Sequence, residues 1–192
     1  MKWKEGNSIM GKASKGFSKL GIFPITVNNS TTYTPGTKVA ITGSQSFSAT
    51  PEVSEWKINA DDGIFDSGSD WNGIKFTLTL AECPLTVKKY FEGGTYDADT
   101  KVYSYYSYSQ APELGMSFQV LQSDNTKLMV RLFSLKCSSF KMDYKTKGES
   151  GDIAPAVIEG LIQNRKTDNK VKEEKETVTD ADLTWLDTLV DS

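Results

Sequence analysis

The sequence predicts an antiparallel β-sandwich or partly open β-barrel of about eight strands, with one short flanking helix and extended terminal arms. Short runs of β-branched and aromatic residues recur along the chain, separated by Gly, Pro, Asn, Asp and Ser. Several runs alternate between apolar and polar residues, which is typical of strands buried on one face. The sequence shows no internal repeat, so a solenoid is not expected.

The charge distribution suggests three regions in this chain of 192 residues. Residues 1–20 carry a net charge of +4 and residues 167–192 a net charge of −5, within a total of −3. We therefore predict a basic N-terminal arm (residues 1–18), one β-domain with a sizeable core (19–166) and an acidic C-terminal segment (167–192). The nearly balanced body gives no indication of a basic DNA-binding protein.

The predicted strands lie within the β-domain. The clearest is residues 74–80, where every second residue is apolar. Residues 128–133 also form a strand, but their pattern is less one-sided, and Ser123, Asp124 and Asn125 make the turn before it. The full set of predicted strands is residues 20–27, 38–47, 55–60, 74–80, 102–109, 116–121, 127–134, 137–144 and 155–164.

Two segments break the β pattern. Residues 84–91 are predicted to form a short helix, because Pro84 suits its first position and Gly93 and Gly94 end it. Residues 179–191 are predicted to form an amphipathic helix that starts with a capping box of Thr179 and Asp182. The charged residues 170–176 between body and tail are interpreted as a solvated linker.

Histidine is absent from the sequence. Its absence excludes Ser-His-Asp and Cys-His nucleophiles and histidine-bearing metal sites. Cys83 and Cys137 lie too far apart for a Cys-x-x-Cys motif and are interpreted as small buried residues in a reducing compartment. We expect a protein that is not an enzyme and has no cofactor and no metal. No stretch approaches the ~20 apolar residues of a membrane span.

Three further patterns each have a structural explanation beside a functional one. Residues 61–70 are rich in Asp, Gly and Ser and are interpreted as a turn rather than a calcium loop. The carboxylates that a glycosidase would need are better explained as solvated strand residues, namely Glu52, Glu55, Glu113 and Glu159. The tyrosines between Tyr103 and Tyr108 either pack within a strand or form a platform for carbohydrate; the carbohydrate-binding module is our alternative function.

The order of elements over residues 20–166 resembles that of the major tail proteins of long, non-contractile-tailed phages, especially phages of Gram-positive hosts. No single short motif carries this resemblance; it rests on an ordered set of segments. These are WKINADDG (56–63), FTLTLAECPL (76–85), the glycines Gly93 and Gly94, QAPELGMSF (110–118), the strand around residues 131–136 and TKGE (146–149).

The resemblance implies a tail tube subunit, a structural virion protein located in the phage tail and assembled in the host cytoplasm. Such subunits form hexameric rings that stack into a hollow tube. The tube encloses the tape-measure protein, meets tail terminator and tail tip proteins, and conducts DNA during infection, without a membrane partner. Ring closure would also remove exposed sheet edges. Because the body has few clustered bases, we expect a weakly acidic or neutral inner wall that does not hold DNA.

The charged ends are the candidate subunit interface. The basic arm and the acidic tail are expected to dock on neighbouring subunits, although the tail helix could equally fold back on its own body. The candidate interface residues are Lys2, Lys4, Lys12, Lys15, Lys19, Leu183, Trp185, Leu186 and Leu189.

Overall fold

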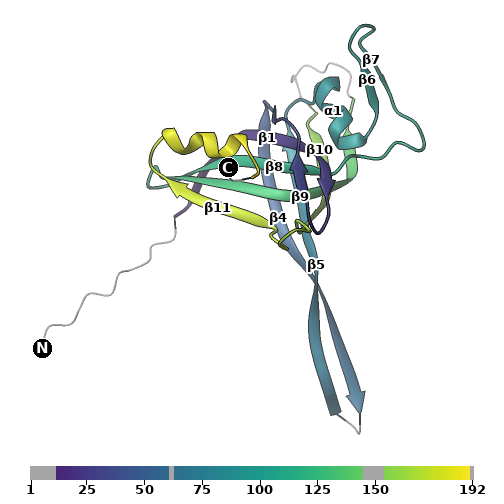
Figure 1. Cartoon of the computed structure of the whole chain (residues 1–192), viewed down its shortest axis with the longest axis vertical. Helices are drawn as coiled ribbons and strands as arrows, with labels where there is room; N and C mark the ends of the chain where they lie inside the picture. Colours follow the sequence, from purple (N-terminus) through teal and green to yellow (C-terminus); the bar gives the residue numbers. More distant parts are fainter. Residues whose placement is uncertain (1–11, 61–62, 145–153, 191–192) are drawn as a thin grey trace, which may run out of the picture.

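The computed structural model of the protein describes residues 12–60, 63–144 and 154–190. The described chain is mainly β and antiparallel, which confirms the predicted fold class. Nine strands form one sheet with the order β2-β1-β8-β9-β10-β5-β4, in which β11 also pairs with β9 and β3 with β1 (Figure 1). The strands of this sheet are β1 (Ser14–Asn28), β2 (Tyr33–Pro35), β3 (Val39–Ala40), β4 (Ser44–Ala60), β5 (Gly63–Leu80), β8 (Leu114–Gln122), β9 (Lys127–Met142), β10 (Ala156–Gln163) and β11 (Lys172–Thr177).

The sheet curls until β1 and β4 approach each other across the core. The ring of Phe17 on β1 stacks on that of Phe47 on β4, with centroids 6.3 Å apart. Phe118 of β8 contacts both rings, at 5.1 and 5.0 Å. These side chains close one side of a core to which the alternating residues of β5 contribute Phe76, Leu78 and Leu80, all almost fully buried. The alternation predicted for residues 74–80 therefore faces the core.

Helix α1 (Leu85–Glu92) lies where the sequence predicts a short helix. Pro84 precedes it, and Val87 and Phe91 are buried in the main core. Gly93 ends it in the left-handed conformation (φ 85°), and its N–H donates to the carbonyl of Lys89. A small separate hairpin of β6 (Thr95–Asp97) and β7 (Val102–Ser104) follows the helix.

Several predicted strand limits are wrong. Residues 127–134 and 137–144 belong to the single long strand β9, and residues 38–47 divide between β3 and β4. The strand predicted for residues 102–109 ends at Ser104. Most of the Asp-Gly-Ser segment predicted as a turn is in β5, since residues 63–70 pair with β4; Asp61 and Asp62 lie outside the described residues.

Both terminal regions also differ from prediction. The body begins earlier than residue 19, because β1 starts at Ser14 and pairs with β8 from there. The charged stretch interpreted as a linker is largely strand β11, which pairs with β9 from Lys172 to Thr177. The predicted tail helix is a short 3-10 helix, η1 (Ala181–Asp187). No helix among the described residues is long and apolar enough to cross a membrane.

Candidate assembly surface

The most unusual feature of the molecule is a long two-stranded arm that leaves the body (Figure 1). Strands β4 and β5 pair with each other from Ser44 and Leu80 to Ala60 and Gly63. Strand β10 pairs with β5 only over residues 74–80, so the sheet does not continue beyond Ile74. We call residues 51–60 and 63–73 the hairpin arm. A two-stranded hairpin alone in water is at best marginally stable, so an arm of this length is expected to be stabilised by contacts with another surface.

The hairpin arm exposes large apolar side chains on both faces. Exposed fractions are 55% for Val53, 40% for Trp56, 51% for Ile58 and 46% for Trp71. Val53 lies opposite Trp71 on one face, whereas Trp56 lies on the other, opposite Gly68. On a soluble protein, a cluster of exposed apolar side chains marks an interaction site, whereas single exposed apolar residues are ordinary. Tryptophan is also the residue type most enriched among the residues that dominate binding energy at protein interfaces.

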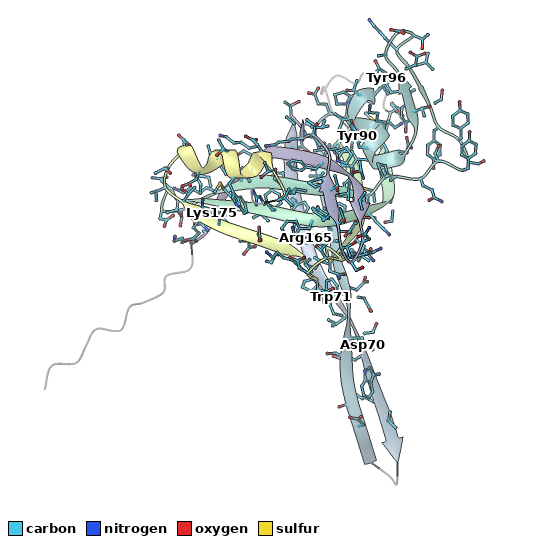
Figure 2. All side chains as sticks on the ribbon, viewed as in Figure 1. Asp70, Trp71, Tyr90, Tyr96, Arg165 and Lys175 are labelled. Carbon is cyan, nitrogen blue, oxygen red and sulfur yellow. The ribbon has the colours of Figure 1, made fainter. Side chains whose placement is uncertain are left out.

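The hairpin arm holds its own shape by local contacts. The Trp56 ring covers Gly68 so closely that a Cβ at residue 68 would collide with the ring. On the same face the Asn72 amide donates a hydrogen bond to the Ser54 hydroxyl, at 2.5 Å. Figure 2 shows Trp71 at the base of the arm and Asp70 next to it, further from the body. Because Gly68 has no side chain, the indole ring of Trp56 can pack directly on the backbone there.

The hairpin arm is acidic and has unpaired edges. Its sequence, residues 51–73, contains six acids and one lysine. The carboxylates of Glu52, Glu55 and Asp70 form no ion pair within the described residues. No strand in the described part of the chain pairs with the outer edge of β4, or with the outer edge of β5 over residues 63–73. Such edges present free N–H and C=O groups for pairing with another chain.

A groove of about 560 Å³ lies at the other end of the body, beside α1. One wall is five consecutive residues of β9, from Lys136 to Phe140, and the other comes from α1 and the loop after β7, with Tyr105 at the rim. In the groove, Glu92 accepts a hydrogen bond from the Tyr103 hydroxyl (2.8 Å) and pairs with Lys88 (3.2 Å). The charge of the Glu92 carboxylate is therefore already balanced by Lys88, whereas Lys136 forms no ion pair among the described residues.

The acidic tail packs against its own body. We call residues 172–190 the C-terminal clasp, which consists of β11, η1 and the residues after η1. Arg131 of β9 is 1% exposed and anchors the clasp. Its Nε and Nη2 donate to the carbonyl of Trp185 (2.9 and 2.6 Å), and Nη2 also donates to the Thr188 hydroxyl (2.9 Å). The guanidinium lies 3.8 Å from the Trp185 ring centroid and 3.6 Å from Glu173. Several donors and an ion pair thus hold the clasp against β9.

The clasp also fills the second face of the sheet. The Ser117 hydroxyl of β8 donates to the carbonyl of Leu186 at 2.7 Å. Leu189 packs with Phe23 and Phe133 in a small second core, and Leu186 is 1% exposed. This cover explains the less one-sided pattern of residues 128–133, since β9 is buried on both faces.

The structure places the predicted interface residues mostly within the chain itself. Lys2 and Lys4 lie outside the described residues. Lys12 pairs with Asp124 and Glu176 of the same chain, at 3.2 and 3.1 Å, and these hydrogen bonds raise the pKa of its ammonium group. Lys15 and Lys19 are exposed. Leu183 and Trp185 are partly buried in the clasp, whereas Leu186 and Leu189 are almost fully buried there, and Leu189 packs against Phe23 and Phe133 of the chain's own sheet.

The other candidate residues are dispersed. Glu113 accepts hydrogen bonds from Asn28 (2.5 Å) and Ser134 (2.6 Å), and Glu52 and Glu55 lie on the hairpin arm. Glu159 lies in the middle of β10. The described residues include no group of three or more acidic, cysteine or histidine side chains that could hold a metal. These carboxylates have structural or surface positions.

The thiols are protected by burial. Burial raises the pKa of Cys83 to about 11 and that of Cys137 to about 12. Both therefore remain protonated near neutral pH and are poor nucleophiles. Their position agrees with the interpretation as small buried residues, since Cys83 is buried and Cys137 is partly buried and packs against the core.

The tyrosine run does not form the predicted strand. Only Tyr103 lies in β7; Tyr105, Tyr106 and Tyr108 follow in a loop, with 55%, 46% and 76% of their surfaces exposed. The rings of Tyr106 and Tyr108 stack on each other at 5.2 Å. Packing within a strand is therefore wrong for these three residues.

The sequence patterns do not predict the hairpin arm. They indicate a strand at residues 55–60 but a turn in the partner segment. The sequence feature that could have indicated the arm is its pair of tryptophans, Trp56 and Trp71, which lie on either side of the turn and belong to no alternating pattern. Both are exposed in the structure.

The comparisons with known proteins show a structural likeness at low sequence identity. No protein-family model matches the chain, and no curated protein matches it. Among solved structures, the chain is similar to a chain in the cryo-EM structure of the anti-feeding prophage (AFP) baseplate, 6-fold symmetrised. The two are 13% identical with a TM-score of 0.39, and the match covers 88% of this chain and 99% of that chain.

Proposed function

We propose that this protein is a structural subunit of a phage tail tube, in which copies form hexameric rings that stack into a hollow tube. The observation that carries the proposal is the hairpin arm: it leaves the body, exposes two tryptophans and has unpaired edges. A structure of this kind needs a partner surface, and repetition of one subunit supplies one at every position. The resemblance of residues 20–166 to major tail proteins supports the same role.

The proposed role is structural rather than catalytic. Its partners are other copies of the chain, the tape-measure protein inside the tube, and the terminator and tip proteins at its ends. Phage DNA passes through without specific binding, because the body carries no large basic cluster that would release counterions. Tight, salt-sensitive binding of DNA to assembled tubes would contradict this part of the proposal.

Electron microscopy of the purified full chain tests the proposal. We expect rings and hollow tubes of about 10 nm in width, the size that six domains of ~20 kDa around a channel would give. The double variant Trp56→Ser, Trp71→Ser should fail to form tubes at concentrations at which the wild type forms them. Tyr144→Ser is the matched control, because Tyr144 is 81% exposed but lies outside the hairpin arm. Tube formation by the tryptophan variant at the wild-type concentration would contradict an assembly role of the arm.

A second candidate function rests on the exposed tyrosine loop. Tyr106 and Tyr108 form a stacked pair whose outer faces are open, and such faces can receive the apolar face of a sugar ring. Glycan-array binding that is lost in Tyr106→Ala, Tyr108→Ala, together with the absence of oligomers by electron microscopy, would favour a carbohydrate-binding module over a tube subunit.

A further inference from the structure

We propose that the β4 strand of the hairpin arm of one copy adds to the free edge of β9 in the groove of a second copy. The inference rests on the proposed function, because it assumes that copies assemble. It assigns the place where the hairpin arm docks.

The groove has the form of a site for an added strand. In the described part of the chain, β8 pairs with β9 only as far as Leu135, and no strand pairs with this edge of β9 over residues 136–142. The opposite edge of the same segment is paired with β10, so its backbone is already held in extended form. Five residues of this half-free segment line the groove. A peptide added here would continue the line of β8 and satisfy the free backbone groups.

The hairpin arm fits this groove in backbone, side chains and charge. The outer edge of β4 is unpaired in the described structure, so both partners offer a free β edge. Trp56 and Ile58 need apolar cover, and the groove provides Phe140 and Tyr105 along its walls. Among the described residues, Glu52, Glu55 and Asp70 of the arm form no ion pair, and neither does Lys136 in the groove, whereas Glu92 in the groove is paired with Lys88.

The two surfaces lie at opposite ends of the molecule. Figure 1 shows the hairpin arm leaving the body at the end away from α1, and α1 forms part of the groove. A contact between different surfaces at opposite ends is heterologous, and it repeats from one copy to the next without limit unless it closes into a ring. The same contact can therefore be repeated at every level of a growing tube.

Cross-linking between singly substituted proteins tests the docking site. One protein carries Glu55→Cys on the hairpin arm and the other carries Ser139→Cys on β9; both side chains are exposed, and neither makes a hydrogen bond within the described residues. The two are mixed, assembled and treated with a short bismaleimide. We expect cross-linked dimers in the mixture at a yield at least about tenfold above that of either protein alone. Glu55→Cys mixed with Ser30→Cys, an exposed position on the β1–β2 turn, is the matched control.

The outcomes separate this inference from the proposed function. Tubes that form but give no more cross-linking for the groove pair than for the Ser30 control overturn the docking site and leave self-assembly standing. If no rings or tubes form under any condition, the proposed function fails and this inference with it. A charge exchange gives an independent reading: Lys136→Glu should raise the protein concentration needed for tubes about tenfold, and Glu55→Lys in the same chain should restore it. Unchanged assembly of Lys136→Glu would contradict the charge complementarity.

Discussion

Replacing Arg131 with Met should weaken the attachment of the C-terminal clasp without disturbing the main core. The Met side chain fills most of the space of the arginine stem but cannot donate to the Trp185 carbonyl or to the Thr188 hydroxyl. Glu173 also loses its ion pair with Arg131, although it keeps the one with Lys170. The three hydrogen bonds of Arg131 reach two acceptors, the Trp185 carbonyl and the Thr188 hydroxyl. Each acceptor bound by a charged donor is worth about 1.5 kcal/mol, and the stacking on Trp185 adds less. We therefore expect a loss of about 3 kcal/mol in the free energy of unfolding.

Urea unfolding of both proteins, followed by tryptophan fluorescence, measures this loss. Lys127→Met is the control, because it removes a surface ion pair with Asp180 and should cost no more than about 0.5 kcal/mol. Hydrogen exchange should show faster opening of residues 172–177 in Arg131→Met than in the wild type, because these residues belong to the clasp that Arg131 anchors. A loss of less than about 1 kcal/mol for Arg131→Met would refute the assignment of Arg131 as the anchor.

Three further predictions concern acid, thiols and one glycine. Hydrogen bonds from Thr177, Lys175 and Thr179 lower the pKa of Asp182 to about 2. The stabilisation that this carboxylate gives is therefore present above the unfolded pKa of about 3.9 and is lost as the pH falls towards 2. The urea midpoint of Asp182→Asn should depend less on pH in that window than the wild-type midpoint, and an identical pH dependence would contradict the assignment. Cys83 and Cys137, whose pKa values are raised to about 11 and about 12, should resist a disulfide reagent at pH 8 until the protein is unfolded; labelling of native Cys137 at the rate of a free thiol would disprove their burial. Gly93→Ala should lower the free energy of unfolding, measured by heat or urea, by about 2 kcal/mol or more, because φ is 85° and a Cβ would collide with the backbone of Gln110. A loss below about 1 kcal/mol would show that the turn can adjust.

The elements that could be predicted from the sequence are those that depend on short, continuous sequence patterns. Residues 74–80 alternate because one face meets the core, and α1 is bounded by Pro84 and Gly93, whose backbone preferences are intrinsic. Both features follow from short-range chemistry, so neither needs knowledge of distant residues.

The elements missed depend on distant partners. Strand β11 consists almost entirely of Lys and Glu, and only Thr177 is buried, so its composition resembles a solvated linker; pairing with β9 makes it a strand. The hairpin arm is exposed on both faces, so its strands show no alternation, and Gly, Ser and Asp in residues 63–70 favour turns. Arg131 lies within an otherwise apolar stretch of β9 because its guanidinium binds Trp185 and Thr188 of the clasp, which are 54 and 57 positions away in the sequence.

The assembly role of the hairpin arm is the central claim, and one measurement addresses it most directly: electron microscopy of the purified full chain beside the variant Trp56→Ser, Trp71→Ser. The account predicts hollow tubes with six-fold symmetry for the wild type and, for the variant, folded protein of unchanged far-ultraviolet circular dichroism that forms no tubes. Wild-type protein that remains as single copies at every concentration, or tubes from the variant equal to those of the wild type, would contradict it.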